Sequence, residues 1–401
     1  MKEVVIVSAA RTPFGRFGGS LKDFNPVDLG AMVMREVITR SGYDGAVNNV
    51  FWGVGDTVSF KDVYTPVIAR QTLIKAGMPP ETTSCTLDTA CTSAMTAMQM
   101  GVMTIQAGEA DTIIAGGVTT FSQMPLLVRN LRFAGHRMGH VAMEDPIFKL
   151  EYKDFAPVAV DAGNMALEHG VSREEQDEWA LISHQRYGAS HAAGKFKEEM
   201  MPVSIPQKKG DPISLEIDEQ YRADISLEKL AKLPTIYGSP TCTAGNAPGL
   251  NDGATGVMIM SREKAQALGL PVMATIVSSS SIAMKPHLLV ETPANAIKAA
   301  LQKAALNIDD MKVLEINEAF AAVTLVSAKL LADGDSAKLK KIKEDLNVNG
   351  GAIAIGHPNT SSGARIVMTM IHELRRRGGG YGAAAICGGL AQGTAMIIKV
   401  D

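Results

Sequence analysis

The chain has 401 residues, a formal net charge of -3, 46% hydrophobic residues and 20% charged residues. This length allows two or three domains around a large core, and the composition is that of an ordinary soluble globular protein. The sequence contains no basic block typical of a nucleic-acid surface and no apolar run long enough to span a bilayer, and its start indicates a first strand instead of a signal peptide. We therefore expect no nucleic-acid or membrane partner.

Four cysteines lie far apart along the chain, except for Cys85 and Cys91. So few cysteines suit a reducing compartment, and none of their spacings is a zinc signature. We predict a cytoplasmic protein with no metal site, in which cysteines serve thiol chemistry more than a disulfide framework.

Strand and helix patterns alternate over the first 120 residues. Strand patterns occupy residues 4–7, 50–55 and 111–117, and helical spacing occupies 26–40, 66–76 and the residues after Cys91. This alternation predicts a layered α/β domain.

The segment Leu87–Gly101 places Cys91 before a run of small residues and methionines. Apolar positions then recur at three- and four-residue spacing up to Gly108, which predicts a buried helix with Cys91 in its first turn. Unpaired N–H groups and the helix dipole favour a thiolate at that position, so Cys91 is a candidate nucleophile. A buried core cysteine is an equally good interpretation of this segment alone.

The residue composition changes over residues 121–250, where methionine, arginine, proline and histidine are mixed. One clear helix is expected from Ser172 to about Ala193, because Ser172 and Glu175 form a capping box and Gly194 ends the pattern. We predict an N-terminal α/β half at 1–120 that is completed by about 251–270, an inserted segment at 121–250, and a C-terminal α/β half at 271–401.

Residues 347–389 repeat the order of residues 85–117: an apolar segment, a loop with a reactive side chain, a helix, and a strand that ends in Gly-Gly. The second helix ends in Arg375–Arg377 and Gly378, which a helix C-terminus explains better than a polyanion site does. If the halves are similar, the Cys91 and His357 loops occupy equivalent positions and can come together at the interface of the two halves.

Three further positions at strand or loop ends are candidates for chemistry. His357 lies in a stiff Gly-His-Pro loop and could take the proton of a thiol, while Cys387, before Gly388-Gly389, could be a second thiol that shuttles a proton. Asn317 follows a strand and could orient a water or an oxyanion, and Glu318 could equally cap the next helix. Each has a structural alternative, but together with Cys91 they indicate Cys-His-Asn acyl transfer.

The chain resembles the thiolase family of acetyl-CoA acetyltransferases and 3-ketoacyl-CoA thiolases over nearly its whole length. The segments that carry this resemblance, in chain order, are 7–15, the Cys91 segment, 172–177, 243–247, 250–254, 317–320, 350–358 and 387–389.

The resemblance implies a fold of two similar α/β halves in five layers (αβαβα), with residues 121–250 as an inserted loop domain that binds coenzyme A. It implies that Cys91 is acylated, that His357 activates it and, with a water held by Asn317, binds the thioester oxygen, and that Cys387 is the acid/base for the α-carbon. The N–H groups of Cys91 and Gly389 would form a second oxyanion hole.

The resemblance also implies which residues contact the substrate, a coenzyme A thioester such as acetyl-CoA or a longer acyl-CoA. Arg222 falls in a pattern similar to the coenzyme A segment, and an arginine suits phosphates. The full expected set is Arg222, Ala247, Pro248, Val158, Leu289 and Phe320. No other cofactor is implied, and the family suggests a homodimer or a homotetramer.

Several residues depart from the family pattern close to these positions. Ala94 replaces a glycine after the nucleophile, Pro248 replaces a serine that commonly contacts the pantetheine arm, and Asn359 begins a more polar loop than usual. We expect these changes to alter the pocket, with Pro157, Val158 and Leu289 moving the substrate optimum away from acetoacetyl-CoA.

Two functions remain open: an active thiolase, or a thiolase-like protein recruited either as an acyltransferase on a non-CoA acceptor or as a structural subunit of a larger complex. The presence of all four catalytic side chains favours the first. We expect the other histidines at 136, 140, 184 and 287 to be surface or loop residues.

Overall fold

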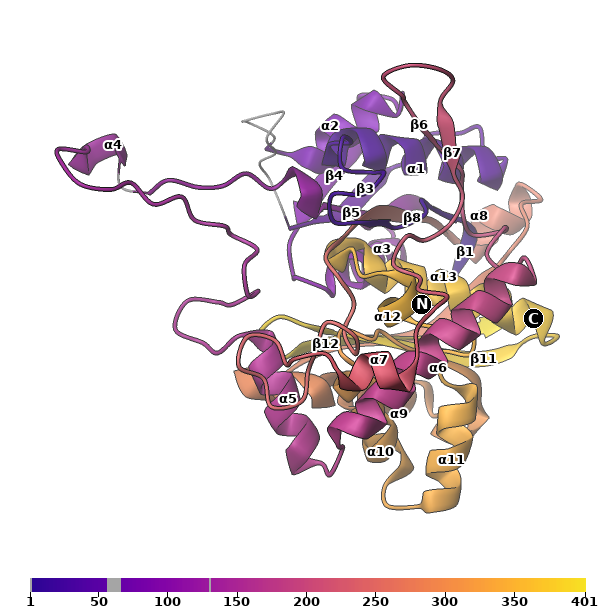
Figure 1. Ribbon diagram of the computed structural model, residues 1–401. Coiled ribbons are helices and arrows are strands. Elements are labelled where there is room, and N and C mark those ends of the chain that lie inside the picture. Colours follow the sequence, from indigo (N-terminus) through magenta and orange to yellow (C-terminus); the bar gives the residue numbers. More distant parts are fainter. Residues whose placement is uncertain (1, 56–65, 130) are drawn as a thin grey trace.

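The computed structural model describes residues 2–55, 66–129 and 131–401. It is an α/β structure with a ten-stranded sheet (Figure 1). Along the path of this sheet the strands are β10 (Met311–Ile316), β11 (Gly380–Gly388), β12 (Gln392–Val400), β9 (Ala274–Ala283), β1 (Val4–Arg11), β8 (Asn251–Ser261), β5 (Thr112–Thr120), β3 (Asn49–Val54) and β4 (Thr83–Leu87). The short β2 (Gly15–Arg16) pairs with β8 beside this path.

The strand order repeats on the two sides of the β1–β9 junction. On one side β1 and β8 pair antiparallel, β8 and β5 pair antiparallel, and β5 and β3 pair parallel. On the other side β9 and β12, β12 and β11, and β11 and β10 follow the same sequence of pairings. The prediction of two similar α/β halves is therefore confirmed.

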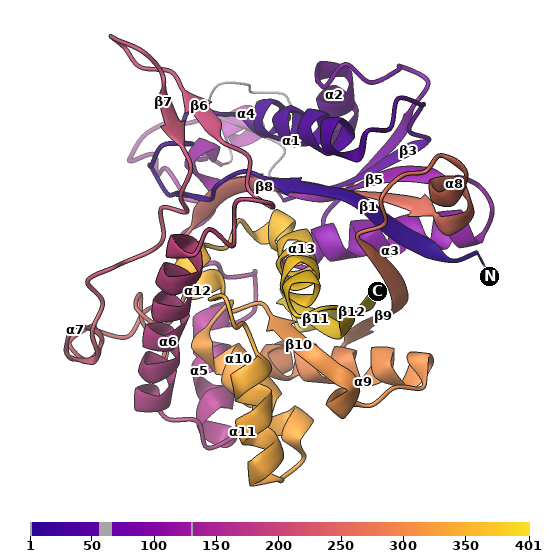
Figure 2. The same ribbon diagram turned by 90° about the vertical axis from the view of Figure 1, so that its right-hand side faces the viewer.

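Helices cover both faces of each half and fill the space between them (Figures 1 and 2). The outer layer of the first half contains α1 (Pro26–Ser41) and α2 (Ile68–Lys75), and the outer layer of the second contains α9 (Thr292–Ala304), α10 (Ala321–Ala332) and α11 (Ser336–Asp345). Between the halves, α3 (Ser93–Gln106) and α13 (Asn359–Arg376) share one buried apolar cluster with strands of both. This arrangement gives the five predicted layers.

Helix ends follow the predicted capping chemistry. Ser172 and Glu175 form a complete capping box at the start of α6 (Arg173–Ala192). At the end of α13, Arg376 and Arg377 pair with Glu373 at 3.0 and 2.9 Å. The structural interpretation of the arginine triplet is therefore confirmed.

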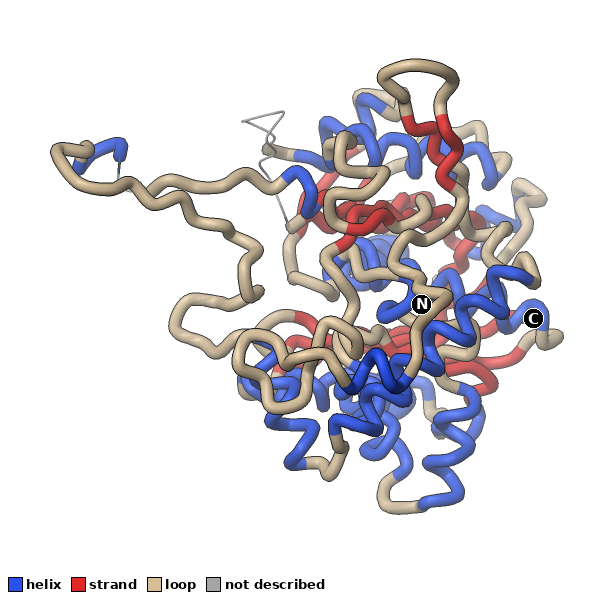
Figure 3. The backbone as a smooth tube through the Cα atoms, in the orientation of Figure 1, coloured by secondary structure: helices blue, strands red, loops and turns tan. Residues whose placement is uncertain are grey.

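The segment 121–250 is largely loop (Figure 3), with more regular elements than the single helix expected. We did not predict α5 (Val158–Glu168), since its buried face consists mainly of alanine and glycine and gives a weak apolar pattern. The other elements of the segment are α4 (Leu131–Ala134), α6, α7 (Leu227–Ala231), the paired strands β6 (Val203–Ile205) and β7 (Ile213–Leu215), and the 3₁₀ turn Phe121–Gln123. The remaining short elements of the chain are α8 (Arg262–Ala267), α12 (Ala352–Ile355) and the 3₁₀ turns Pro286–Glu291 and Ile308–Asp310. The domain boundaries at 120, 250 and 270 stay a prediction.

A buried ion-pair network joins the segment 121–250 to β1. The guanidinium of Arg11 lies 2.7 Å from Asp218 and 2.8 Å from Glu199, and all three side chains are buried. Buried charges are tolerated only when they are paired in this way. The network fixes the part of the chain that leads to Arg222.

Candidate active site

Cys91 lies at the apex of a tight turn between β4 and α3. The turn is closed by the Ser93 hydroxyl, which accepts a hydrogen bond from the Thr89 N–H at 2.9 Å, and Ala90 adopts a left-handed backbone with φ of 52°. The helix begins at Ser93 with Thr92 as its cap, so the prediction that Cys91 lies in the first turn is wrong by two residues. The reason is that the side-chain bonds within the turn hold Cys91 before the cap.

His357 faces Cys91 from the other half of the molecule. Its Nε2 lies 3.2 Å from Cys91 Sγ. Its backbone N–H donates to the Asn251 side chain at 2.8 Å, and the preceding Gly356 has a φ of +110°, packed so closely against Asn251 that a side chain would clash. This stiff loop fixes the ring, as the sequence predicted.

Ser362 fixes the tautomer of His357. The Ser362 hydroxyl lies 2.7 Å from His357 Nδ1 and 3.1 Å from the carbonyl oxygen of Pro358. If Ser362 donates its single proton to this carbonyl, it must accept from Nδ1–H, and the lone pair of Nε2 then faces the thiol of Cys91. His357 is thus oriented as a base toward Cys91.

Both members of this pair are uncharged at neutral pH. Burial raises the pKa of Cys91 to about 12, with the charge of Asp88 adding to the shift. Burial, followed by the positive charge of Arg365, lowers the pKa of His357 to about 3. The expectation that the helix terminus favours a resting thiolate is therefore wrong, because desolvation outweighs the stabilising backbone N–H.

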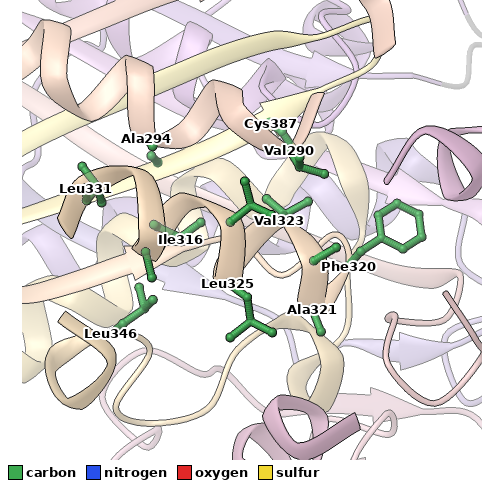
Figure 4. Close-up of a cluster of buried hydrophobic side chains, with 14 of the residues drawn as sticks. Val290, Ala294, Ile316, Phe320, Ala321, Val323, Leu325, Leu331, Leu346 and Cys387 are labelled. Carbon is green, nitrogen blue, oxygen red and sulfur yellow. The ribbon is translucent and has the colours of Figure 1, made fainter. Parts of the chain in front are cut away.

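Cys387 lies at the end of β11 and is buried. It belongs to the same apolar cluster as Val290 and Phe320 (Figure 4). Burial raises the pKa of Cys387 strongly, and the charge of Cys91 raises it further, so the two thiols are close enough to influence each other.

Asn317 lies beside His357, whereas the Glu318 carboxylate forms its hydrogen bonds with other residues. The Asn317 amide nitrogen is 3.4 and 3.5 Å from the two ring nitrogens of His357, and its Oδ1 is buried without a hydrogen-bond partner in the described part of the chain. Glu318 instead accepts hydrogen bonds from Trp179, Ser183, Asn347 and the Ile353 N–H. It does not cap α10, so that interpretation is wrong.

These groups meet at a cavity of about 550 Å³. Its wall includes Cys91, His357, Cys387 and Gly389. All six residues expected to contact the substrate also line it: Val158, Arg222, Ala247, Pro248, Leu289 and Phe320. Asn317 reaches the site through its contact with His357.

The remaining predicted positions agree with the sequence-based expectation only in part. Ala94 packs in the buried cluster between the halves, away from the cavity, whereas Asn359 and Pro248 line it. His184 is buried and not at the surface, and burial lowers its pKa to about 4, helped by the charge of Arg222. His136, His140 and His287 are exposed as predicted.

Sequence reasoning missed Ser362, Asn251 and Tyr152 as members of the site. Ser362 carried a usable signal, since it follows His357 by five residues and so lies in the first turn of the next helix. Tyr152 lies in an irregular loop, where no periodic pattern marks it.

Within residues 2–55, 66–129 and 131–401, no group of three or more His, Cys, Asp or Glu side chains is arranged to hold a metal ion. Over the same residues, every helix is too short or too polar to cross a membrane.

Comparisons with known proteins find similarity along the whole length of the chain. The model of the thiolase N-terminal domain matches residues 4–263, and that of the thiolase C-terminal domain matches residues 270–400. An acetyl-CoA acetyltransferase of Pseudomonas aeruginosa is 39% identical, with 100% of each chain covered. Human mitochondrial 3-ketoacyl-CoA thiolase superposes with a TM-score of 0.93 at 37% identity, covering 100% of this chain and 99% of that one. The same human enzyme in complex with CoA superposes with a TM-score of 0.92 at 37% identity, covering 100% and 98%.

Proposed function

The chain belongs to the thiolase family, and we propose that it transfers an acyl group between Cys91 and coenzyme A or acetyl-CoA. The observation that carries this proposal is the 3.2 Å contact between His357 Nε2 and Cys91 Sγ at a cavity that Cys387 also lines. A neutral thiol beside a neutral imidazole becomes a nucleophile when the proton passes to the ring as substrate binds.

In the cleavage direction, Cys91 attacks the 3-keto carbon of a 3-ketoacyl-CoA. The bond between C2 and C3 breaks, the acyl group stays on Cys91, and the acetyl-CoA enolate takes a proton from Cys387. The raised pKa of Cys387 supports this role, since a protonated thiol is available at neutral pH. Coenzyme A then gives its thiol proton to Cys387 and attacks the acyl-enzyme, and the departing Cys91 takes back its proton from His357. Condensation is the reverse path.

Two separate oxyanions form in this sequence, and the site offers two sets of donors. His357 and a water held by Asn317 would bind the oxygen of the CoA thioester, and the unpartnered polar atom of Asn317 supports this role. The backbone N–H groups of Cys91 and Gly389 would bind the oxygen of the group on Cys91.

Different residues of the cavity wall would contact the coenzyme A part and the acyl part of a CoA thioester. Arg222 is exposed at the cavity wall, where a guanidinium can pair with phosphate, and Ala247 and Pro248 would border the pantetheine arm. Val158, Leu289 and Phe320 would border the acyl group. The enzyme would need no cofactor beyond its CoA substrates.

We also propose a cytoplasmic homodimer or homotetramer. The segment around α4 extends away from the rest of the chain (Figure 1) and carries strongly exposed apolar side chains, with Phe133 96% and Met138 93% exposed. In addition, β4 is at one end of the sheet path, and no strand among the described residues pairs with its outer edge. A second copy of the chain is the occupant that we expect for both surfaces.

Thiolysis measured across 3-ketoacyl-CoA chain lengths tests the proposal, with Cys91→Ser as the inactive control. We expect activity with an optimum at a substrate other than acetoacetyl-CoA, because Val158 and Leu289 line the part of the cavity that would hold the acyl group. A sharp optimum at acetoacetyl-CoA would contradict the expected specificity. Absence of thiolysis at every length would instead favour the alternative, an acyltransferase on a non-CoA acceptor or a structural subunit.

A further inference from the structure

The side chain of Tyr152 enters the cavity from the irregular loop before α5 and ends against the backbone beside Cys387. The packing around Gly389 defines its position: a Cβ atom on Gly389 would overlap the hydroxyl oxygen of Tyr152. Tyr152 lines the same cavity as Cys91, Cys387 and Gly389. Its hydroxyl therefore lies next to the residue whose N–H we assign to an oxyanion.

Building on the proposed function, we propose that the Tyr152 hydroxyl donates a third hydrogen bond to the carbonyl oxygen of the acyl group on Cys91, beside the N–H groups of Cys91 and Gly389. No hydrogen bond of this hydroxyl to any part of the chain that the structure describes competes with that contact. A donor aimed at this oxygen stabilises the tetrahedral intermediates more than the acyl-enzyme, because negative charge develops on the oxygen as they form.

The surroundings of Tyr152 keep its phenol protonated, so that it can donate a hydrogen bond. Burial raises the pKa of Tyr152 to about 12, and the charges of Cys91, Asp88 and Cys387 add to the shift. The phenol is thus protonated throughout the range in which an enzyme works, and its proton is available for a hydrogen bond.

The backbone around Tyr152 is held in an unusual conformation. Lys149, Leu150 and Asp154 have φ values of 66°, 48° and 68°, in the left-handed region that such residues rarely adopt. Local strain of this kind persists where surrounding contacts determine the conformation. The same loop brings the Tyr152 hydroxyl against Gly389.

Tyr152→Phe tests the proposal, since it keeps the ring and removes only the hydroxyl. We expect thiolysis kcat to fall by roughly 10²-fold, which is the usual loss on removing one oxyanion donor, with little change in the KM for coenzyme A. Tyr381→Phe is the matched control: Tyr381 lies at the opposite end of β11 from Cys387, outside the cavity, and should keep wild-type kcat.

A spectroscopic measurement separates a hydrogen bond from a packing effect. Enzyme acetylated with carbonyl-labelled acetyl-CoA is examined by difference infrared spectroscopy, and the thioester carbonyl stretch should move to higher frequency in Tyr152→Phe. A wild-type kcat in this variant, or an unshifted carbonyl band, overturns the role of Tyr152. If the wild-type protein itself takes up no acetyl group, it is the proposed function that fails.

Discussion

The Oγ atom of Ser362 lies 2.7 Å from Nδ1 of His357, while the other ring nitrogen of His357 faces Cys91 at 3.2 Å. Ser362→Ala leaves the neutral ring free to place its proton on either nitrogen, so only part of the population can act as a base. We expect kcat to fall about tenfold to a hundredfold, less than the ~10²–10⁴-fold that a general base contributes.

The matched control is Ser361→Ala. The Ser361 hydroxyl donates to the same Pro358 carbonyl at 3.2 Å and is equally buried, but its hydroxyl has no hydrogen bond to His357 in the described structure. Steady-state thiolysis should leave Ser361→Ala near the wild-type kcat. Equal losses in the two variants would show that the helix start, and not the tautomer, is what Ser362 controls.

Arg222→Ala should weaken coenzyme A binding without slowing the chemistry. A charge-assisted bond to phosphate contributes to the ground state and the transition state alike, so we expect KM for coenzyme A to rise about tenfold with kcat within about twofold of wild type. Lys232→Ala is the control, because Lys232 pairs with Glu228 and does not line the cavity. A fall in kcat at unchanged KM would place Arg222 in the reaction itself.

Glu318→Ala should be strongly destabilising. The substitution leaves four donors around a buried site without their acceptor, from Trp179, Ser183, Asn347 and Ile353. We expect the free energy of unfolding, measured with urea, to drop by about 3–5 kcal/mol. Glu344→Ala, at an exposed glutamate, should change it by less than about 0.5 kcal/mol. A small loss in Glu318→Ala would mean that these donors find other acceptors.

His184 should make stability depend on pH below neutrality. The pKa of His184 is about 4 in the folded protein, and its ordinary value of 6.5 applies to the unfolded chain. As pH falls below 6.5, the unfolded chain binds a proton that the folded protein does not bind, so the free energy of unfolding decreases. Between pH 7 and pH 5 this single group accounts for about 2 kcal/mol.

The test compares urea unfolding of wild type and His184→Asn at the two pH values. The variant should lose about 2 kcal/mol less than wild type on going to pH 5. His136→Asn, at an exposed ring, should behave as wild type. An identical pH response in wild type and His184→Asn would mean that His184 titrates normally in the folded protein.

Local sequence patterns predicted the elements that depend on neighbouring residues. The capping box at Ser172 and the arginine-rich end of α13 are examples, and the repeated order of elements correctly brought Cys91 and His357 together. The protonation state of Cys91 could not be predicted in this way, because burial by distant segments outweighs the helix terminus. Tyr152 was equally out of reach, since its contact with Gly389 joins a patternless loop to a strand end more than 200 residues away.

Cys91 is the residue that we propose to carry the acyl group, and peptide mass spectrometry after incubation with acetyl-CoA is the direct test of this proposal. We predict one acetyl group on the peptide that contains Cys91, no label in Cys91→Ser, and complete release of the label when coenzyme A is added. Acetylation at Cys85, Cys242 or Cys387 with Cys91 unmodified, or an unchanged level of label in Cys91→Ser, would contradict it.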